Sequence, residues 1–422
     1  MEEKVEWYLD FVDFSYRAKN DDLIAKFKIK PAKGFSIDEA AGRVASESSV
    51  GTWTTLASLT PSVKELMAKA YKIDNSFVWV AYPYTLFEPG NMPQILSSIA
   101  GNIFGMKAIA SLRLEDVVWP EKLMRSFKGP KFGVEGIRDL LKVTKRPLLA
   151  SVPKPKLGLT HKEHAAYGYD AWIGGLDLLK DDENLTSQSF NNFEFRAKET
   201  FRMRDKAEKE TGERKSYLIN ITSETKEMIR RAKLVKELGG EYVMIDIITS
   251  GWSALQTLRD VCDELGLAIH AHRAFHAAFT RSIEHGMSMN LVAEISRIIG
   301  VDQLHIGTVV GKLEASKEEV LTLKEKLTTS RNGWKGMKKV FPVSSGGLHV
   351  GLIPRLLSML GTDIVVQVGG GVWGHPSGGR AGARALRDAI DSYMNNIPLD
   401  EYAKKSRELR EALQKWGRQT YI

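Results

Sequence analysis

The sequence predicts an α/β protein in which a C-terminal (β/α)₈ TIM barrel follows a smaller α+β, ferredoxin-like domain. From about residue 129, short runs that are apolar throughout are separated by amphipathic stretches, and such runs suit strands buried on both faces. Before that point, two of the expected strands, residues 22–30 and 109–118, alternate apolar and polar residues, as strands with one buried face do. The 422 residues are enough for two cores. We therefore expect domains at residues 1–128 and 129–422.

In the first domain, residues 22–30 form an alternating segment that ends at Pro31 and predicts a strand. Ser36 and Glu39 have the spacing of a capping box, so a helix should follow to about residue 47. Further strands are expected at residues 77–82 and 109–118. A helix is expected at residues 92–104, where Pro93 suits the first turn.

In the second domain, the apolar runs predict eight strands, each followed by a helical segment such as residues 224–238 or 254–264. The final segment, residues 382–414, has a helical pattern and should pack outside the barrel. The predicted strands are residues 148–152, 176–179, 217–221, 242–247, 267–270, 303–306, 340–343 and 364–368.

The composition excludes several classes of protein. A net charge of +8 would suit a nucleic-acid binder, but the basic residues are interleaved with acidic ones and form no basic block. An anionic small substrate explains the excess equally well. No apolar run is long enough to cross a membrane, and the first residues lack a signal-peptide pattern. The single cysteine, Cys262, allows no intrachain disulfide and fits a reducing cytoplasm.

Polar residues gather where the predicted barrel strands end, which is where such barrels carry their chemistry. Seven of the nine histidines lie between His270 and His375. Together with lysines, an arginine and acids, they predict a site for a polyanionic substrate and a metal. The residues at these ends are Lys154, Lys156, Lys180, Asp181, Asp182, Glu183, Asn220, Asp246, His270, His272, Arg273, His276, His305, Lys312, Ser345, His349 and His375.

Residues 174–187 are the most informative stretch, because an apolar run ends there in Lys180, Asp181, Asp182 and Glu183. Three interpretations are open. The group is a solvated acidic turn with a paired lysine, or a Mg²⁺ site with carboxylate ligands, or a Mg²⁺ site in which the lysine has taken up CO₂. The resulting carbamate would be a third oxygen ligand.

Two anion subsites are predicted around this stretch. Ser345-Gly346-Gly347 and Gly369-Gly370-Gly371 follow the last two strands, where barrels often bind phosphate through backbone N–H groups. Arg273 and His305 could bind a second anion, so a bisphosphate of sugar size is expected. The loop at residues 309–314, with Lys312, is either a lid over the substrate or a plain surface loop.

Two features of the first domain have open interpretations. The polar stretch at residues 47–54 is either a helix cap with a packed Trp53 or a binding loop. Asn102, in an apolar segment, is by itself a satisfied core amide.

A zinc hydrolase of the amidohydrolase type would use similar residues. Its His-x-His motif belongs on the first barrel strand, whereas His270 and His272 lie on the fifth. The acids beside Lys180 also favour Mg²⁺ over Zn²⁺, so this alternative is disfavoured.

Several of these segments together resemble the large chain of ribulose-1,5-bisphosphate carboxylase/oxygenase. The short length and the sequence from Val152 to Lys156 are most similar to the archaeal form III branch. The resemblance extends over nearly the whole chain. The segments that carry it are residues 46–55, 174–187, 270–277, 307–314, 344–349 and 369–376.

The resemblance implies an enzyme, a carbon–carbon lyase, that adds CO₂, or O₂ as a side reaction, to ribulose-1,5-bisphosphate. It implies one Mg²⁺ held by Asp182, Glu183 and a carbamate on Lys180, which is also the base. It implies proton transfers by Lys154 and His272, and a catalytic Lys312 paired with Glu47. The implied substrate-binding residues are Glu47, Thr52, Trp53, Asn102, Lys156, Arg273, His305, Ser345, Gly346, Gly347, Gly369 and Gly370.

The resemblance also implies a cytoplasmic homodimer with shared active sites, in which Glu47, Thr52, Trp53 and Asn102 serve the neighbouring subunit. It allows a higher oligomer of dimers and implies no small subunit, and for archaeal members a role in nucleotide (AMP) salvage. The alternatives are a related enolase or isomerase of a phosphorylated ketose, and a non-catalytic phosphosugar-binding protein. Both would be expected to lose some of these residues.

The sequence departs from plant-type members at several positions. Val152 and Ile306 stand where hydroxyl residues are usual, and Ala315 replaces a common glycine. The chain also ends soon after Trp416, so a C-terminal latch over the lid would be short. These departures concern turnover and CO₂/O₂ discrimination, and they leave the expected reaction class unchanged.

Overall fold

The computed structural model describes residues 7–311, 316–330, 334 and 336–419. Contacts divide the chain into two compact units. The first comprises residues 1–128, 275–299 and 330–337, and the second comprises residues 129–274, 300–329 and 338–422. Each is described by itself. Among the helices described, none combines the length and the apolar character that crossing a membrane requires.

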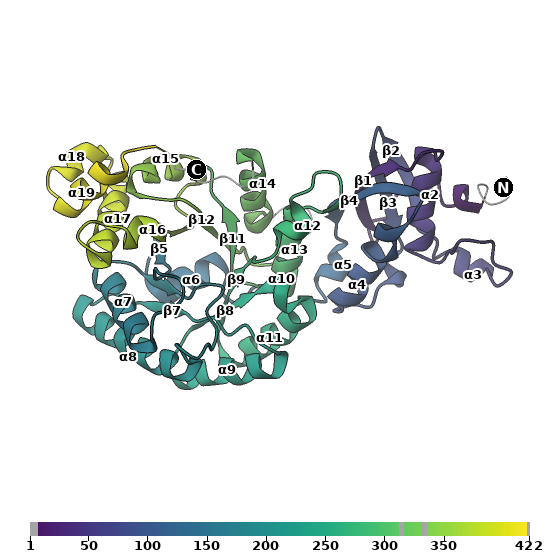
Figure 1. The fold of residues 1–422 in the computed structure, drawn as a ribbon. Helices are drawn as coiled ribbons and strands as arrows, with labels where there is room; N and C mark the ends of the chain where they lie inside the picture. Colours follow the sequence, from purple (N-terminus) through teal and green to yellow (C-terminus); the bar gives the residue numbers. More distant parts are fainter. Residues whose placement is uncertain (1–6, 312–315, 331–333, 335, 420–422) are drawn as a thin grey trace. The chain divides into compact units, whose positions relative to one another are not determined.

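The first unit is built on a five-stranded sheet in the order β10-β4-β1-β3-β2 (Figure 1). Three of these strands were predicted, two of them from their alternating pattern. In β1, Leu23, Ala25, Phe27 and Ile29 are buried while the residues between them are not, so one face forms the core. The strands are β1 (Leu23–Pro31), β2 (Lys69–Asp74), β3 (Phe77–Tyr82), β4 (Ile109–Val118) and β10 (Gly286–Met287).

The first predicted helix of this unit is confirmed, since Ser36 accepts the backbone N–H of Glu39 at the start of α2. The second is shorter than predicted, because α4 ends at Ile99 and a 3₁₀ turn, η2, follows. The helices are α2 (Ile37–Glu47), α3 (Pro61–Lys64), α4 (Met92–Ile99), α5 (Glu121–Met124), α12 (Ala277–Thr280) and α13 (Met289–Ile299), with the 3₁₀ turns η1 (Tyr84–Leu86) and η2 (Asn102–Gly105).

The second unit is the predicted barrel. Eight strands pair in parallel in the order β7-β6-β5-β13-β12-β11-β9-β8, and a bridge from Asn220 to Met244 joins the last strand to the first. All eight predicted strands are present, within a few residues of their expected bounds. They are β5 (Leu148–Ser151), β6 (Leu178–Lys180), β7 (Ser216–Leu218), β8 (Tyr242–Asp246), β9 (Ala268–His272), β11 (Gln303–Gly307), β12 (Phe341–Ser345) and β13 (Val365–Gln367).

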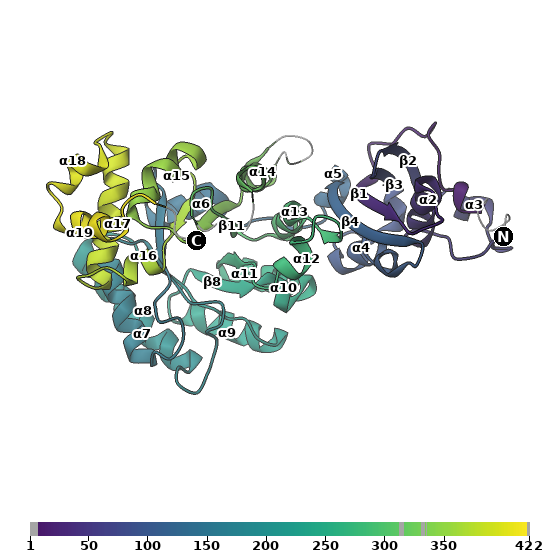
Figure 2. The same ribbon diagram turned by 45° about the horizontal axis from the view of Figure 1, so that its top comes forward.

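Helices surround these strands, and α17, α18 and α19 pack together on the outside, as predicted for the final segment (Figures 1 and 2). The helices are α6 (Gly133–Leu141), α7 (His161–Ile173), α8 (Phe193–Thr211), α9 (Thr225–Glu237), α10 (Ile247–Ser250), α11 (Trp252–Leu265), α14 (Lys317–Thr328), α15 (Ile353–Leu360), α16 (Gly370–Trp373), α17 (Gly379–Met394), α18 (Leu399–Ala403) and α19 (Arg407–Trp416), with the 3₁₀ turn η3 (Val350–Leu352).

One end of the barrel is closed by an apolar cluster. The first residues of six strands, among them Leu148, Tyr242 and Phe341, pack there with Val134 and Ile137 of α6. Because this plug fills the amino-terminal ends of the strands, polar side chains are left to the carboxyl ends.

Candidate active site

The carboxyl end of β6 carries the basic and acidic residues singled out in the sequence. Lys180 is fully buried, and its Nζ donates to the carbonyl oxygen of Asp181 at 2.8 Å and lies 3.7 Å from Oε2 of Glu183. Asp182 is 3% exposed and accepts from Nζ of Lys154, at the end of β5, at 2.8 Å. The interpretation as a solvated acidic turn is therefore wrong, because the lysine and two of the acids are buried.

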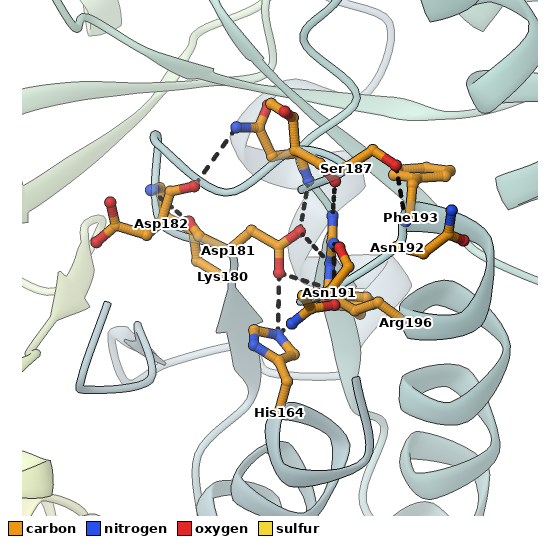
Figure 3. A network of polar contacts seen from close by, with 12 residues as sticks. His164, Lys180, Asp181, Asp182, Ser187, Asn191, Asn192, Phe193 and Arg196 are labelled. Atoms are coloured by element: carbon orange, nitrogen blue, oxygen red, sulfur yellow. Dashed lines mark hydrogen bonds and ion pairs between the residues drawn. The ribbon is translucent and has the colours of Figure 1, made fainter. Parts of the chain in front are cut away.

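The side chain of Asp181 points away from this group and anchors the loop from the other side (Figure 3). Its carboxylate lies 3.2 Å from Nε of Arg196 and 3.0 Å from Nε2 of His164, and it accepts from the Tyr217 hydroxyl and the Asn220 backbone N–H. Burial opposes its ionisation, but the Arg196 charge and the hydrogen bonds outweigh burial and lower the pKa of Asp181 to about 2.

The electrostatic environment disfavours the charged form of the lysine and favours the ionised forms of the two acids. Burial holds the pKa of Lys180 below its usual value despite the nearby carboxylates. Burial works against ionisation of Asp182, but the hydrogen bond and charge of Lys154 lower its pKa. Burial likewise opposes ionisation of Glu183, and the charges of His272 and Lys180 lower its pKa.

His272, the last residue of β9, faces the same group. Its Nε2 lies 3.7 Å from Oε2 of Glu183, and its Nδ1 lies 3.2 Å from Oδ1 of Asp246 at the end of β8. The sequence placed Asp246 at a strand end but gave it no role. Its position at a parallel strand end was the signal that could have identified it as the orienting partner of His272.

The predicted second anion subsite lies at the ends of β9, β11 and β12. Nδ1 of His305 lies 2.9 Å from Oγ of Ser345, and Nε2 lies 3.0 Å from Nε2 of His270. Arg273 lies beside Gly307, where an added Cβ would come 3.1 Å from its guanidinium. A side chain at position 307 would therefore crowd Arg273.

The two glycine loops follow β12 and β13 as predicted. Gly346 and Gly347 are exposed with φ of +114° and +62°, a conformation that favours glycine. Gly369 lies against Lys154, since an added Cβ would come 3.3 Å from Cε of that lysine. Gly370, also exposed, begins α16. The loop after β13 thus lies against Lys154, whereas the loop after β12 presents exposed backbone.

Lys156 and Lys312 are the remaining predicted residues of the barrel. Lys156 is exposed in the loop after β5. Lys312 lies outside the described residues, as does the rest of the proposed lid to Ala315. The start of that loop is no plain surface segment, because Val309 and Val310 are each 4% exposed.

Four predicted site residues belong to the first unit. Glu47 is the last residue of α2, and the carbonyl oxygen of Thr52 accepts from Nε1 of Trp7 at 3.0 Å. Trp53 is 67% exposed, so the interpretation as a packed tryptophan is wrong. Asn102 is also exposed, because the helix ends before it, so it is not a core amide.

The donor set at the end of β6 fits a hard cation. Asp182 and Glu183 offer carboxylate oxygens, which Mg²⁺ prefers. Throughout the part of the chain that the structure describes, no group of three or more histidine, cysteine, aspartate or glutamate side chains is arranged to hold a metal ion. The third residue of the group, Lys180, offers an amine 3.7 Å from Oε2 of Glu183.

Comparison with known proteins identifies the family. The profile described as "Ribulose bisphosphate carboxylase large chain, N-terminal domain" matches residues 10–123, and the profile of its catalytic domain matches residues 133–416. The chain belongs to this family. It is an enzyme of the carboxylase type, a carbon–carbon lyase.

The relatives are similar over nearly the full length. The ribulose bisphosphate carboxylase of Pyrococcus furiosus is 55% identical, with 98% of this chain and 99% of that protein covered. The octameric Rubisco of Pyrococcus horikoshii, solved with sulfate, has a TM-score of 0.95 at 53% identity, with 98% of both chains covered. The dimeric archaeal Rubisco of Hyperthermus butylicus has a TM-score of 0.92 at 50% identity, covering 97% and 99%.

Proposed function

We propose that this chain is a ribulose-1,5-bisphosphate carboxylase/oxygenase that converts ribulose-1,5-bisphosphate, CO₂ and water into two molecules of 3-phosphoglycerate, with O₂ as the substrate of a side reaction. The observation that carries the proposal is the buried Lys180, 3.7 Å from Glu183, with Lys154 and Asp182 paired beside it at the open end of the barrel. Relatives that share about half of the sequence bear this name.

Lys180 is the residue that would be activated by CO₂. Burial lowers the pKa of its amine, so a larger fraction is neutral and nucleophilic at neutral pH. The amine nitrogen attacks the carbon of CO₂, one proton leaves, and a carbamate anion forms. Lys180 as carbamate, Asp182 and Glu183 would hold one Mg²⁺, which when bound supplies Lewis-acid stabilisation of negative charge on the substrate oxygens.

The chain's own residues then move the protons. The Lys180 carbamate takes the proton from C3 of the substrate, and C2 attacks CO₂ to form the new carbon–carbon bond. Water adds at C3, the C2–C3 bond breaks, and a proton returns to C2. Lys154 and His272 would take part in these proton transfers. Nζ of Lys154 is held 2.8 Å from Asp182, and His272 is held beside Asp246.

The substrate phosphates would occupy two places. Gly346, Gly347 and Gly370 are exposed and Gly369 is half-buried, so the backbone N–H groups of these glycines suit one phosphate, together with Thr52 and Trp53 of the neighbouring subunit. Arg273, with Lys156, His305 and Ser345, suits the other side of the substrate. Lys312, paired with Glu47, would close over the substrate and exclude water.

We further propose that the enzyme acts in the cytoplasm, as a homodimer or an oligomer of dimers without a small subunit, in nucleotide (AMP) salvage. The support is the resemblance to archaeal members, and the solved relatives are dimeric in one organism and octameric in another.

The decisive experiment measures ¹⁴CO₂ incorporation into phosphoglycerate with ribulose-1,5-bisphosphate and Mg²⁺, with and without preincubation in bicarbonate. We expect labelled 3-phosphoglycerate, and a higher initial rate after preincubation. Absence of labelled phosphoglycerate under both conditions would refute the proposal.

Lys180→Ala tests the carbamate separately. We expect loss of carboxylation by at least about a thousandfold, because both a metal ligand and the base are removed. We also expect a carbamate signal in the ¹³C NMR spectrum under ¹³CO₂ that this variant lacks. Lys206→Ala is the control, since that lysine is half exposed. Carboxylation by Lys180→Ala at the control rate would contradict the carbamate mechanism.

A further inference from the structure

A continuous chain of hydrogen bonds runs through the barrel interior below the proposed site. Nε2 of Gln303 donates to the Tyr242 hydroxyl at 3.2 Å, and Oε1 of Gln303 lies 2.8 Å from Nδ1 of His270. The chain continues through the two Nε2 atoms of His270 and His305 at 3.0 Å, and ends with Nδ1 of His305 at 2.9 Å from Oγ of Ser345.

Each member of the chain is fixed in place by the barrel. Tyr242, Gln303 and His270 are fully buried, and His305 is 2% exposed. These four residues lie on β8, β9 and β11, and Ser345 lies on β12. They are on the side of each strand that faces the barrel axis, because on β9 and β12 they are two residues from the apolar plug residues Ala268 and Val343. Gln303 is a polar residue among apolar neighbours on its strand, and the proposed mechanism does not use it.

The direction of this chain of hydrogen bonds, meaning which atom of each pair donates, follows from the side-chain amide of Gln303. Burial and the nearby cations hold the pKa of His270 and His305 well below the usual value, so both rings are neutral and each carries one N–H. The Oε1 of Gln303 can only accept, so Nδ1 of His270 carries the proton and its Nε2 is bare. Nε2 of His305 must then donate to it, which leaves Nδ1 of His305 to accept from Ser345.

We propose that Gln303 and Tyr242 are positioning residues that set the direction of this chain and so turn the hydroxyl proton of Ser345 toward His305. In the structure the amide donates through Nε2 to the Tyr242 hydroxyl and presents its oxygen to His270. Ser345 then offers its lone pairs to the open end of the barrel and accepts a hydrogen bond from a hydroxyl group of the ligand. Because both ring nitrogens of His305 are engaged, His305 acts on the substrate side through Ser345, and Arg273 binds the anion.

This inference deepens the proposed function, on which its ligand part rests. It predicts that the Tyr242–Gln303 pair contributes to the preference for a hydroxylated sugar bisphosphate over a bisphosphate without hydroxyl groups. Reversing the chain would make Ser345 a donor, and a ligand hydroxyl facing it would lose its acceptor.

The first test needs no ligand and no activity. Long-range ¹⁵N–¹H NMR of the full-length chain with ¹⁵N-labelled histidine distinguishes the two neutral tautomers of each ring. His270→Gln and His305→Gln assign the signals. We expect His270 as the Nδ1–H tautomer and His305 as the Nε2–H tautomer. Finding His270 as the Nε2–H tautomer would overturn the inference.

The second test compares binding of ribitol 1,5-bisphosphate with binding of pentane-1,5-diol bisphosphate, which spans the same length without the inner hydroxyls, by calorimetry with Mg²⁺ and bicarbonate. Gln303→Met removes the acceptor at similar volume, and we expect it to reduce the preference for the ribitol ligand about 10-fold while leaving the other affinity unchanged. Gln303→Glu keeps an acceptor facing His270 and should keep the preference within about twofold.

The outcomes separate the two proposals. If Gln303→Met retains the full preference, the positioning role is refuted. If the wild-type protein binds neither bisphosphate, the proposed function fails, and the tautomers measured by NMR still decide the direction of the hydrogen bonds. If Gln303→Met does not fold, Tyr242→Phe replaces it, because loss of the hydroxyl frees the amide to turn over and should mix the two tautomers of His270.

Discussion

Asp181 is the residue that holds the loop after β6 in shape, although the proposed chemistry belongs to its neighbours. It is fully buried and faces Arg196, which is also fully buried. Breaking a buried ion pair destabilises the folded state, because removal of one partner leaves the other charge in the interior without compensation. The backbone that presents Lys180 and Asp182 therefore depends on a carboxylate that points away from them.

Asp181→Asn should lower the free energy of unfolding by about 3 kcal/mol, because the buried Arg196 loses its counter-charge. The control is Asp170→Asn, which disrupts a pair with Arg380 whose side chains are 40% and 54% exposed and should change stability by less than about 1 kcal/mol. Denaturant unfolding at pH 7 measures both. Equal effects of the two substitutions would contradict the anchoring role.

The same residue predicts a pH dependence. The pKa of Asp181 in the folded chain is about 2, below its unfolded value near about 4, so its stabilisation is full above that unfolded value and is lost as pH falls toward 2. The stability difference between the wild type and Asp181→Asn should thus shrink below about pH 4. A difference that stays constant or grows with acid would show that the charge is not its source.

At the scale of elements, residues 416–419 pack against the segments that follow the two glycine loops of the proposed phosphate subsite. The carbonyl oxygen of Gln419 lies 2.8 Å from Nε2 of His349, after β12. The Trp416 ring lies between His349 and His375, at centroid distances of 6.3 and 6.5 Å. Gly351 in η3 lies so close to Gly417 that an added Cβ would overlap its carbonyl oxygen.

Gly351→Val should displace this segment and loosen both loops. We expect KM for ribulose-1,5-bisphosphate to rise about 10-fold with a smaller change in kcat, because ground-state binding is what the loops provide. Truncation after Trp416 removes the same contacts without a clash and should reproduce the effect. If the truncated chain keeps the wild-type KM while Gly351→Val does not, the defect lies in η3 and the supporting role of the segment is refuted.

At the scale of the whole molecule, the proposal places Glu47 and Lys180 of one active site on different subunits. Glu47 ends α2 in the first unit, and Lys180 ends β6 in the second. Single variants Lys180→Ala and Glu47→Gln should each be inactive as homodimers. In a mixed dimer, one of the two sites would then have both residues intact.

We expect co-expressed Lys180→Ala and Glu47→Gln chains to recover up to about a quarter of wild-type activity, since half of the dimers are mixed and each mixed dimer has one complete site. Differently tagged chains and tandem purification isolate the mixed dimer, and ¹⁴CO₂ incorporation measures activity. A purified mixed dimer with no more activity than its parents would count against shared sites.

The sequence by itself determined the architecture and the family. The eight barrel strands are continuous apolar runs, and β1 and β4 alternate, so local pattern was enough to place them. It did not predict β2 or the two-residue β10, because β2 is half exposed and β10 is defined only by its pairing with β4. Nor did it show that α4 stops before Asn102.

Only the tertiary structure decided what the polar residues at the strand ends do. The three consecutive acids from Asp181 to Glu183 look alike in sequence, yet packing turns Asp181 toward Arg196 and brings Asp182 to Lys154. The partnership of His272 with Asp246, and the chain from Tyr242 to Ser345, join residues far apart in sequence. Residue type fixes which hydrogen bonds are possible, whereas barrel closure decides which donors and acceptors meet.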